Sequence, residues 1–308
     1  MKRSRSRKEL PLPPRRTCGA MQVHHRLLEQ HPAFRLRQGL LEHATAARLS
    51  AGVALREGTV TIPVVVHVVY HTAVENLSTA QITSQIDALN RDYGAKNTDR
   101  KRVPSVWKGL VTDTRVRFAL ATRDPSGKST DGIHRVKTTR TSFLDDDHVK
   151  SSKTGGADAW PARKYLNLWV CSLGSQLLGY AQFPGGPART DGVVILNRAF
   201  GTKGIATAPF NLGRTAVHEV GHWLNLRHIW GDTEDCSGTD HVADTPNAQH
   251  PNYGKPKFPH VSCGNAPNGD MFMNYMDYVD DDTMVMFTAG QVARMQATLD
   301  KARSAIGA

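Results

Sequence analysis

The chain has 308 residues, 39% of them hydrophobic, which is enough for one large folded domain or two modest ones. Its net charge of +11 would favour a nucleic-acid partner, but residues 1–56 hold twelve Lys and Arg against three Glu, so most of the charge belongs to one end. No apolar run reaches the roughly eighteen residues of a membrane span, and four cysteines are too few for a disulfide scaffold.

The basic end starts with MKRSRSRKELPLPPRR, whose charge and proline content predict a disordered start. The apolar stretch of a secretory signal does not follow these charges, so unconventional export, a gene start elsewhere and an intracellular protein all stay open. From Met21 to about Arg48, apolar residues at helical spacing predict helical segments interrupted near Pro32. Residues 44–58 are typical of a linker, which places the start of the main domain near Gly58.

Strands and helices are mixed in the first part of this domain. Residues 59–70 form a β-branched apolar run that predicts a buried strand, and residues 78–94 carry an apolar stripe that predicts a helix. Further strands are predicted at residues 116–124, 165–173, 178–184 and 192–200. Residues 229–287 are loop-rich, and a capping box from Thr288 to Gln291 opens a closing helix. We therefore expect an α+β fold.

The segment TAVHEVGHWLNLRH, residues 215–228, predicts a metal site. His218 and His222 are four residues apart, so on a helix both face the same side and can share one cation. His228 supplies a third imidazole, which leaves a fourth coordination position open. Glu219 lies beside these ligands without being one, where a general base takes a proton from water. An HExxH match alone arises by chance, but the third histidine at this spacing makes the metal site the favoured hypothesis.

A second motif, FMNYMDYVDDD at residues 272–282, lies downstream of the first. Together with HEVGHWLNLRHIWGD it resembles the metzincin zinc endopeptidases, and most closely the pappalysin (ulilysin-like) family, over about residues 60–300. The resemblance implies a twisted mixed five-stranded sheet with backing and active-site helices in residues 57–228. An irregular C-terminal subdomain with a closing helix would then occupy residues 229–308. It also implies an extended polypeptide substrate, docked along the strand edge at residues 178–184.

The resemblance gives a role to each residue of the two motifs. It implies that one catalytic zinc ion is bound by His218, His222 and His228. Glu219 would be the general base of peptide-bond hydrolysis. Met276 matches the methionine of the Met-turn beneath the zinc site. Tyr278 matches a tyrosine that stabilises the developing oxyanion.

Asn225 stands where the HExxHxxGxxH pattern has glycine. The helix must stop there and turn back so that His228 reaches the metal, and such a turn commonly needs a positive φ. Asparagine is the next most tolerant residue in that region. We therefore expect Asn225 to end the helix in a left-handed conformation.

Family members of this type carry four C-terminal cysteines, paired first with third and second with fourth. This chain keeps the first, Cys236, and the third, Cys263, while Lys255 and Thr283 stand at the other two positions. The resemblance therefore implies one disulfide, Cys236–Cys263, and with it an oxidising, extracellular location. Two free thiols are the alternative. Cys171, in an apolar strand, is expected to be an inert buried thiol.

Cys18 and Gly19 resemble the pro-segment switch that keeps several metzincins latent, in which a thiolate occupies the open zinc position. A free cysteine in a tail is the alternative. If the switch is present, residues 1–56 form a basic pro-segment that acts as an intramolecular inhibitor. Cleavage near Arg48 or Arg56 would then activate a catalytic domain of residues 57–308.

Two acidic segments have implied roles as well. DTEDCSGTDHVADTP is rich in oxygen donors, and the resemblance implies structural calcium near it, with candidate ligands Asp240, Asp244 and Thr245. Asp281 resembles a carboxylate at the floor of the pocket for the residue after the scissile bond, which would favour Arg or Lys there. Asp280 and Asp282 flank it, so the assignment could be off by one.

Three classes of function compete. The leading hypothesis is a zinc endopeptidase made as a zymogen. The second is a catalytically silent metal-binding or inhibitory protein that keeps the fold, which the intact Glu219 and the complete set of histidines argue against. The third is a basic nucleic-acid binder, which the location of the charge on a removable tail argues against. We expect no nucleic-acid or membrane partner.

Overall fold

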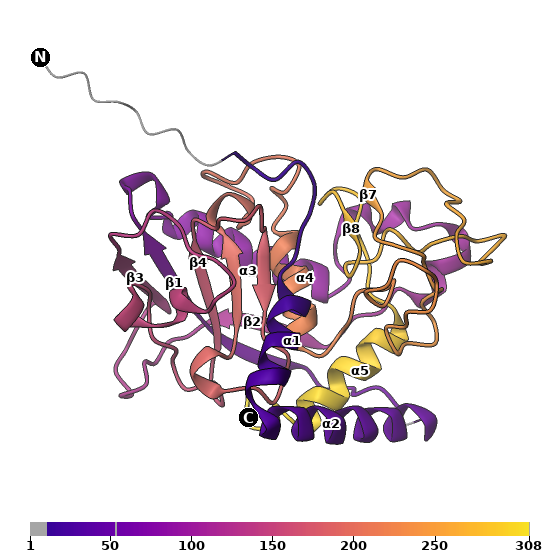
Figure 1. Ribbon diagram of the computed structural model, residues 1–308, viewed down its shortest axis with the longest axis horizontal. Coiled ribbons are helices and arrows are strands. Elements are labelled where there is room, and N and C mark those ends of the chain that lie inside the picture. The colour runs from indigo at the N-terminus through magenta and orange to yellow at the C-terminus, as the bar shows by residue number, and fades with distance from the viewer. Residues whose placement is uncertain (1–10, 53, 308) are drawn as a thin grey trace, which may run out of the picture.

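A six-stranded sheet forms the centre of the structure, a computed structural model that describes residues 11–52 and 54–307 (Figure 1). The strands are β1 (Val60–Tyr70), β2 (Val116–Leu120), β3 (Ile133–Lys137), β4 (Leu166–Cys171), β5 (Gly179–Ala181) and β6 (Val193–Leu196). They lie in the order β2–β1–β4–β6–β5, and β3 pairs with the second half of β1. Only β5 is antiparallel to its neighbour, so a short antiparallel strand forms one edge of the sheet.

Helices cover the sheet because its strands are apolar on both faces. Nearly all side chains of β1, β4 and β6 are buried, as expected for parallel strands between layers. Helix α3 (Thr79–Tyr93) begins at Ser78, whose side chain accepts a hydrogen bond from the Gln81 amide, and packs against β2. Helix α4 (Arg214–Trp223) packs against α3, β5 and β6, and every one of its residues is buried.

Two further helices, α1 (Ala20–Gln30) and α2 (Pro32–Ser50), precede the sheet in the chain. The predicted break near Pro32 is confirmed, with Pro32 as the first residue of α2. Helix α1 packs against β5, and α2 packs against α5 (Ala289–Asp300) (Figure 1). The predicted disorder of the chain start falls largely on residues 1–10, outside the described residues.

The linker predicted at residues 44–58 is wrong in its first half, because α2 continues to Ser50. The stretch ATAARLS consists mostly of good helix formers, and Thr45 is buried. The Arg48 guanidinium forms a 2.6 Å ion pair with Asp300 of α5, and Arg56 pairs with the same carboxylate. Both predicted cleavage residues are therefore anchored to the closing helix.

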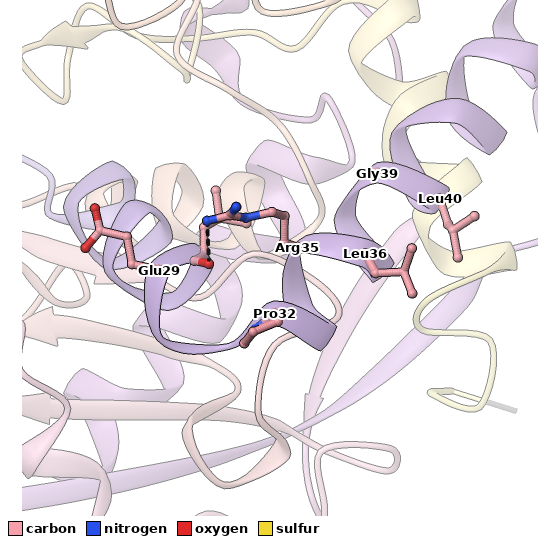
Figure 2. A pocket seen from close by; sticks show the side chains of 7 residues that line it. Glu29, Pro32, Arg35, Leu36, Gly39 and Leu40 are labelled. Carbon is pink, nitrogen blue, oxygen red and sulfur yellow. Dashed lines mark hydrogen bonds between the residues drawn. The ribbon is translucent and has the colours of Figure 1, made fainter.

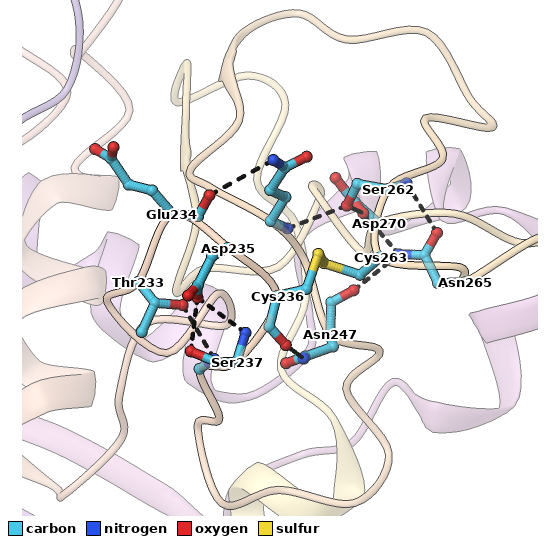
Figure 3. Close-up of a disulfide and its surroundings, with 12 residues drawn as sticks. Thr233, Glu234, Asp235, Cys236, Ser237, Asn247, Ser262, Cys263, Asn265 and Asp270 are labelled. Carbon is cyan, nitrogen blue, oxygen red and sulfur yellow. Dashed lines mark hydrogen bonds between the residues drawn. A yellow bond between two sulfur atoms is a disulfide. The ribbon is translucent and has the colours of Figure 1, made fainter.

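Residues 229–287 contain little regular structure, as predicted. The described residues there form only the two-residue strands β7 (Tyr253–Gly254) and β8 (Tyr278–Val279). The predicted disulfide Cys236–Cys263 is present and ties two loops together (Figure 3). Lys255 and Thr283, which stand at the positions of the missing second bridge, both contact the Asp282 carboxylate. Lys255 forms a 2.5 Å ion pair with it, and the Thr283 hydroxyl donates to it. The positions of both bridges expected for the family are thus linked here, one by a disulfide and the other by an exposed ion pair.

The α+β fold class is confirmed, with two differences in detail. The sheet has six strands rather than five, because residues 133–137 pair with β1 although most of their side chains are not buried. The strands expected at 178–184 and 192–200 are shorter, since β5 covers three residues and β6 four. None of the helices among the described residues is long and apolar enough to cross a membrane.

Candidate active site

Three histidine side chains converge at the C-terminal end of α4. His218 and His222 lie one turn apart on this helix, and His228 follows the turn after it. The Nε2 atom of His222 lies 3.1 Å from that of His218 and 3.1 Å from that of His228, and the third separation is 3.3 Å. The Cys18 sulfur completes a group of four buried ligand atoms that lie within 4.8 Å of one another.

Each imidazole is oriented by an acceptor at its Nδ1 atom. The acceptors are the Tyr275 carbonyl at 2.7 Å for His218, the Leu226 carbonyl at 2.8 Å for His222 and the Asp232 carboxylate at 2.5 Å for His228. Donation from Nδ1 leaves a lone pair on each Nε2 atom. Burial also lowers the pKa of His218 and His222, which keeps these rings neutral, as a metal ligand must be.

This donor set fits a zinc ion. Three Nε2 lone pairs within 3.3 Å of one another are mutually repulsive unless a cation lies between them. A tetrahedral zinc ion with bonds of about 2.0–2.1 Å separates its nitrogen ligands by roughly 3.3 Å. The observed spacing therefore matches the edge of such a tetrahedron, and the thiol of Cys18 faces the remaining position.

The turn after α4 depends on Asn225. Its φ of 74° lies in the left-handed region, as expected from the sequence. The Asn225 amide donates to the His222 carbonyl at 2.9 Å, and the Leu226 amide donates to the Gly221 carbonyl at 2.9 Å. The Asn225 carbonyl in turn accepts a 2.6 Å hydrogen bond from Arg294 of α5. These bonds end the helix and direct the chain back towards the metal site.

Glu219, Cys18 and Tyr278 meet beside the histidines. The Cys18 thiol donates to the Glu219 carboxylate at 3.3 Å, and the Cys18 amide donates to the Tyr278 hydroxyl at 3.2 Å. The Tyr278 ring lies 4.9 Å from the His228 ring, measured between centroids. A carboxylate, a thiol and a phenol therefore surround the open side of the histidine cluster.

Burial sets the protonation of this group. It raises the pKa of Glu219 to about 8, although the Cys18 hydrogen bond and the charge of Arg16 act in the opposite direction. Burial and the nearby Glu219 carboxylate raise the pKa of the Cys18 thiol. A cation at the histidine cluster acts against burial, because it favours the ionised Glu219 carboxylate and deprotonates a coordinated thiol.

Met276 packs directly beneath α4. A Cβ atom added at Gly221 would lie 2.5 Å from the Met276 sulfur, so only glycine fits between the two histidines at this point. Met276 itself is fully buried. The glycine of HEVGH therefore allows the methionine to support the helix that carries the ligands.

Residues 17–19 lie along the outer edge of β5. The Gly19 amide donates to the Gly179 carbonyl at 3.0 Å, and the Leu178 amide donates to the Thr17 carbonyl at 3.0 Å. The bridge between Cys18 and Gly179 is parallel. A Cβ at Gly179 would lie 2.9 Å from Cγ of Glu219, which explains the glycine at this position. The segment thus runs parallel to β5 across the face of the site.

Arg16 reaches the Asp281 carboxylate. The two form a 2.5 Å ion pair with 1% and 0% of their side chains exposed, and the Leu212 amide donates to the other Asp281 oxygen at 2.7 Å. Asp282 is more exposed and pairs with Lys255 instead. Of the three adjacent aspartates, Asp281 is the one that holds a cation next to the site.

The residues predicted to bind calcium use their oxygens for other contacts. Asp240 accepts from the Thr245 hydroxyl at 2.8 Å, and burial raises its pKa to about 7. Asp244 caps α5 by accepting from the Thr288 hydroxyl at 2.6 Å and the Gly290 amide at 2.8 Å. Among the described residues, the histidine cluster is the one group of three or more metal-ligating side chains. The calcium site stays a prediction.

Sequence reasoning missed three residues of the site: Arg16, Gly179 and Asp232. Asp232 lies four residues after His228 in HIWGD, and this spacing was the one feature of the sequence that could have indicated its role. Arg16 and Gly179 reach the site only through the fold.

A separate cavity of about 650 Å³ lies between α1 and α2 (Figure 2). Its lining belongs to the two N-terminal helices and includes none of the site residues.

Fold and site together define a metalloprotease of the metzincin class. Residues 148–300 match the family model described as pregnancy-associated plasma protein-A. An extracellular metalloprotease of Pyricularia oryzae is 31% identical over 297 residues, which cover 93% of this chain and 89% of that protein. The chain belongs to the pregnancy-associated plasma protein-A (pappalysin) family of peptidases.

Two solved structures are similar over most of their length. A variant of promirolysin from Tannerella forsythia is 46% identical, with a TM-score of 0.86, and the match covers 94% of this chain and 95% of that one. Mature mirolysin from the same organism, in complex with a cleaved peptide, is 50% identical with a TM-score of 0.80. That match covers 81% of this chain and 96% of mirolysin.

Proposed function

We propose that this metalloprotease is a zinc-dependent endopeptidase made as a latent zymogen. The observation that carries the proposal is the cluster of three oriented Nε2 atoms, 3.1–3.3 Å apart, with the Glu219 carboxylate next to it. The residues that would hold zinc are His218, His222 and His228. When bound, zinc supplies Lewis acidity, which makes water more acidic and polarises a peptide carbonyl.

The remaining chemistry belongs to side chains of the chain. Glu219, whose carboxylate lies beside the histidine cluster, accepts a proton from the attacking water and later donates it to the leaving amine. The Tyr278 hydroxyl, now bonded to the Cys18 backbone at 3.2 Å, donates to the developing oxyanion. The outer edge of β5 offers main-chain groups to an extended peptide, as it does now to residues 17–19.

Residues 1–56 form the inhibitory pro-segment in this proposal. The Cys18 sulfur lies where a fourth metal ligand would be, and the backbone of residues 17–19 occupies the edge of β5. Substrate cannot bind in their presence. The likeness to promirolysin over 94% of the chain, against 81% for mature mirolysin, supports a removable segment of this size.

The Asp281 carboxylate favours Arg or Lys after the scissile bond. The buried ion pair of Asp281 with Arg16 supports this preference, because a guanidinium already fits there at 2.5 Å. An extracellular location is supported by the disulfide and by relatives named extracellular metalloproteases.

The test uses a denatured protein as substrate. The full chain and the chain after removal of its first 56 residues are incubated with and without a metal chelator, beside Glu219→Ala. We expect cleavage only by the processed wild type, its loss with chelator and its recovery on adding zinc. A processed protein that binds zinc yet cleaves nothing would instead support a silent metal-binding protein. Random residues after the cut sites would exclude the role proposed for Asp281.

A further inference from the structure

The acidic loop of residues 145–147 lies beside Gly19, whereas Arg16 precedes Cys18 on the other side along the chain. A Cβ atom at Gly19 would lie 3.4 Å from Cβ of Asp145, so this loop flanks the chain immediately after Cys18. Further along, Arg26 of α1 donates 2.8 Å hydrogen bonds to the Asp147 carboxylate and to the Asp145 carbonyl. A second arginine of the N-terminal segment is therefore bound to this acidic loop.

The Asp147 carboxylate is fixed in place before any ligand reaches it. Its other oxygen lies 2.8 Å from the ammonium group of Lys150, which is fully buried and also donates to the Thr190 carbonyl at 2.8 Å. The backbone at Asp147 has a φ of 64°, in the left-handed region, immediately before the 3₁₀ turn His148–Lys150. Lys150 therefore holds one oxygen and leaves the other directed at Arg26.

A cavity and an unpartnered phenol adjoin this loop. The cavity, of about 480 Å³, lies between α1 and the sheet domain and is lined by Asp146, Asp147 and Asp158 among others. The Tyr180 hydroxyl is buried without a hydrogen-bond partner among the described residues. Asp147 and Asp146, after burial itself, raise the pKa of this phenol, so it lies near the same carboxylates. The cavity is also lined by Arg26 and Leu27, so its wall on the α1 side leaves with the N-terminal segment.

Removal of the N-terminal segment would leave this region acidic. Arg26 would be gone, and the remaining lining would hold the carboxylates of Asp146, Asp147 and Asp158 against the cations of Lys150 and Arg189. The Asp147 oxygen that now binds Arg26 would lose its partner. An excess of negative charge with a preformed hydrogen-bond acceptor favours a guanidinium or an ammonium group.

We propose that in the processed enzyme the loop 145–147 is a subsite for Arg or Lys at a position before the scissile bond. The proposal rests on the proposed function, in which Asp281 takes the residue after that bond. Arg16, Cys18 and Gly19 follow one another from the Asp281 pocket past the metal site to Asp145. A substrate whose residue after the scissile bond lies at Asp281 therefore places the residues before that bond at the loop 145–147. Its chain direction is then opposite to that of the pro-segment.

The experiment compares peptides that differ at single positions. Each carries Arg after the scissile bond and Arg, Ala or Glu at one of the three positions before it. We expect the processed wild type to prefer Arg over Ala at one of these positions by about tenfold in kcat/KM, with Glu poorer than Ala. Asp147→Asn should reduce that preference to roughly twofold. Asp87→Asn, on the exposed face of α3, is the matched control and should keep the preference.

Three outcomes decide the matter. Equal cleavage of Arg and Ala peptides by the wild type at every position overturns the proposal, and so does a preference that persists in Asp147→Asn. Cleavage of none of the peptides by the wild type overturns the proposed function instead. Because Asp147 also pairs with buried Lys150, the melting temperature is measured in parallel. If Asp147→Asn does not fold, Asp145→Asn takes its place, and an unchanged preference there counts against the subsite.

Discussion

Replacing Arg16 with alanine tests how the pro-segment is held. The Arg16 guanidinium forms a 2.5 Å ion pair with Asp281 and donates to the Val279 carbonyl and the Thr215 hydroxyl, both at 3.1 Å. Removing one partner of a buried pair costs about 3–5 kcal/mol, because the other charge stays buried without compensation. Asp281 keeps the Leu212 amide as a donor, so we take the lower value, about 3 kcal/mol. That cost raises the fraction of molecules with a released segment by about 100-fold.

The assay is alkylation of Cys18 by iodoacetamide in the full-length chain, with Glu219→Ala in the background to prevent self-cleavage. The thiol reacts only when the segment leaves the site, so the alkylation rate reports the released fraction. We expect Arg16→Ala to raise the rate about 100-fold. Arg15→Ala is the control, because exposed Arg15 only lies over the Tyr253 ring at 4.6 Å. Equal rates for the two variants would refute the idea that the Asp281 pair anchors the pro-segment.

Three further predictions concern the supporting structure. Asn225→Gly should keep one zinc per chain, whereas Asn225→Val should lose it because a β-branched residue resists a φ of 74°; equal zinc contents would contradict this. Gly221→Ala should destabilise the protein by about 1–3 kcal/mol through the clash with Met276. Gly39→Ala, which meets open space on α2, should not lower the melting temperature, and a similar loss in both variants would count against the packing argument. Burial lowers the pKa of His67 from 6.5 to about 4. As the pH falls, His67 is therefore protonated in the unfolded state before it is protonated in the folded state, so the free energy of unfolding decreases between pH 6.5 and pH 4. The free energy of unfolding should fall by about 3 kcal/mol over this range. His67→Gln should flatten the slope of unfolding free energy against pH. An unchanged slope would show that His67 does not titrate on unfolding.

The sequence predicted the parts of the site that lie close together along the chain. The spacing of His218, His222 and His228 depends only on helix geometry and one turn, so the motif was sufficient to expect their convergence. The left-handed turn at Asn225 followed from the same local reasoning. The closing helix was predicted from its capping box for a similar reason, because Thr288 and Gln291 are three residues apart.

Contacts between distant segments could not be predicted in this way. Arg16 and Asp281 are 265 residues apart, and nothing in the basic tail distinguishes Arg16 from its neighbours. The loop 145–147 lies beside Gly19 only because of the fold. Strand β3 was missed because most of its side chains are not buried, so it lacks the apolar run that marks a strand between layers. The end of α2 was misplaced although ATAARLS consists mostly of good helix formers, and α2 also packs against α5, a contact that the sequence does not reveal.

The central claim is that Glu219 performs catalysis without binding the metal. The most direct measurement combines zinc content with peptide cleavage in processed Glu219→Gln and wild type. Because Glu219 lies beside the ligands and the glutamine is nearly isosteric, we expect one zinc per chain in both proteins. We also expect a fall in kcat of about 10²–10⁴-fold in the variant. Cleavage by Glu219→Gln at close to the wild-type rate, with zinc retained, would contradict the account.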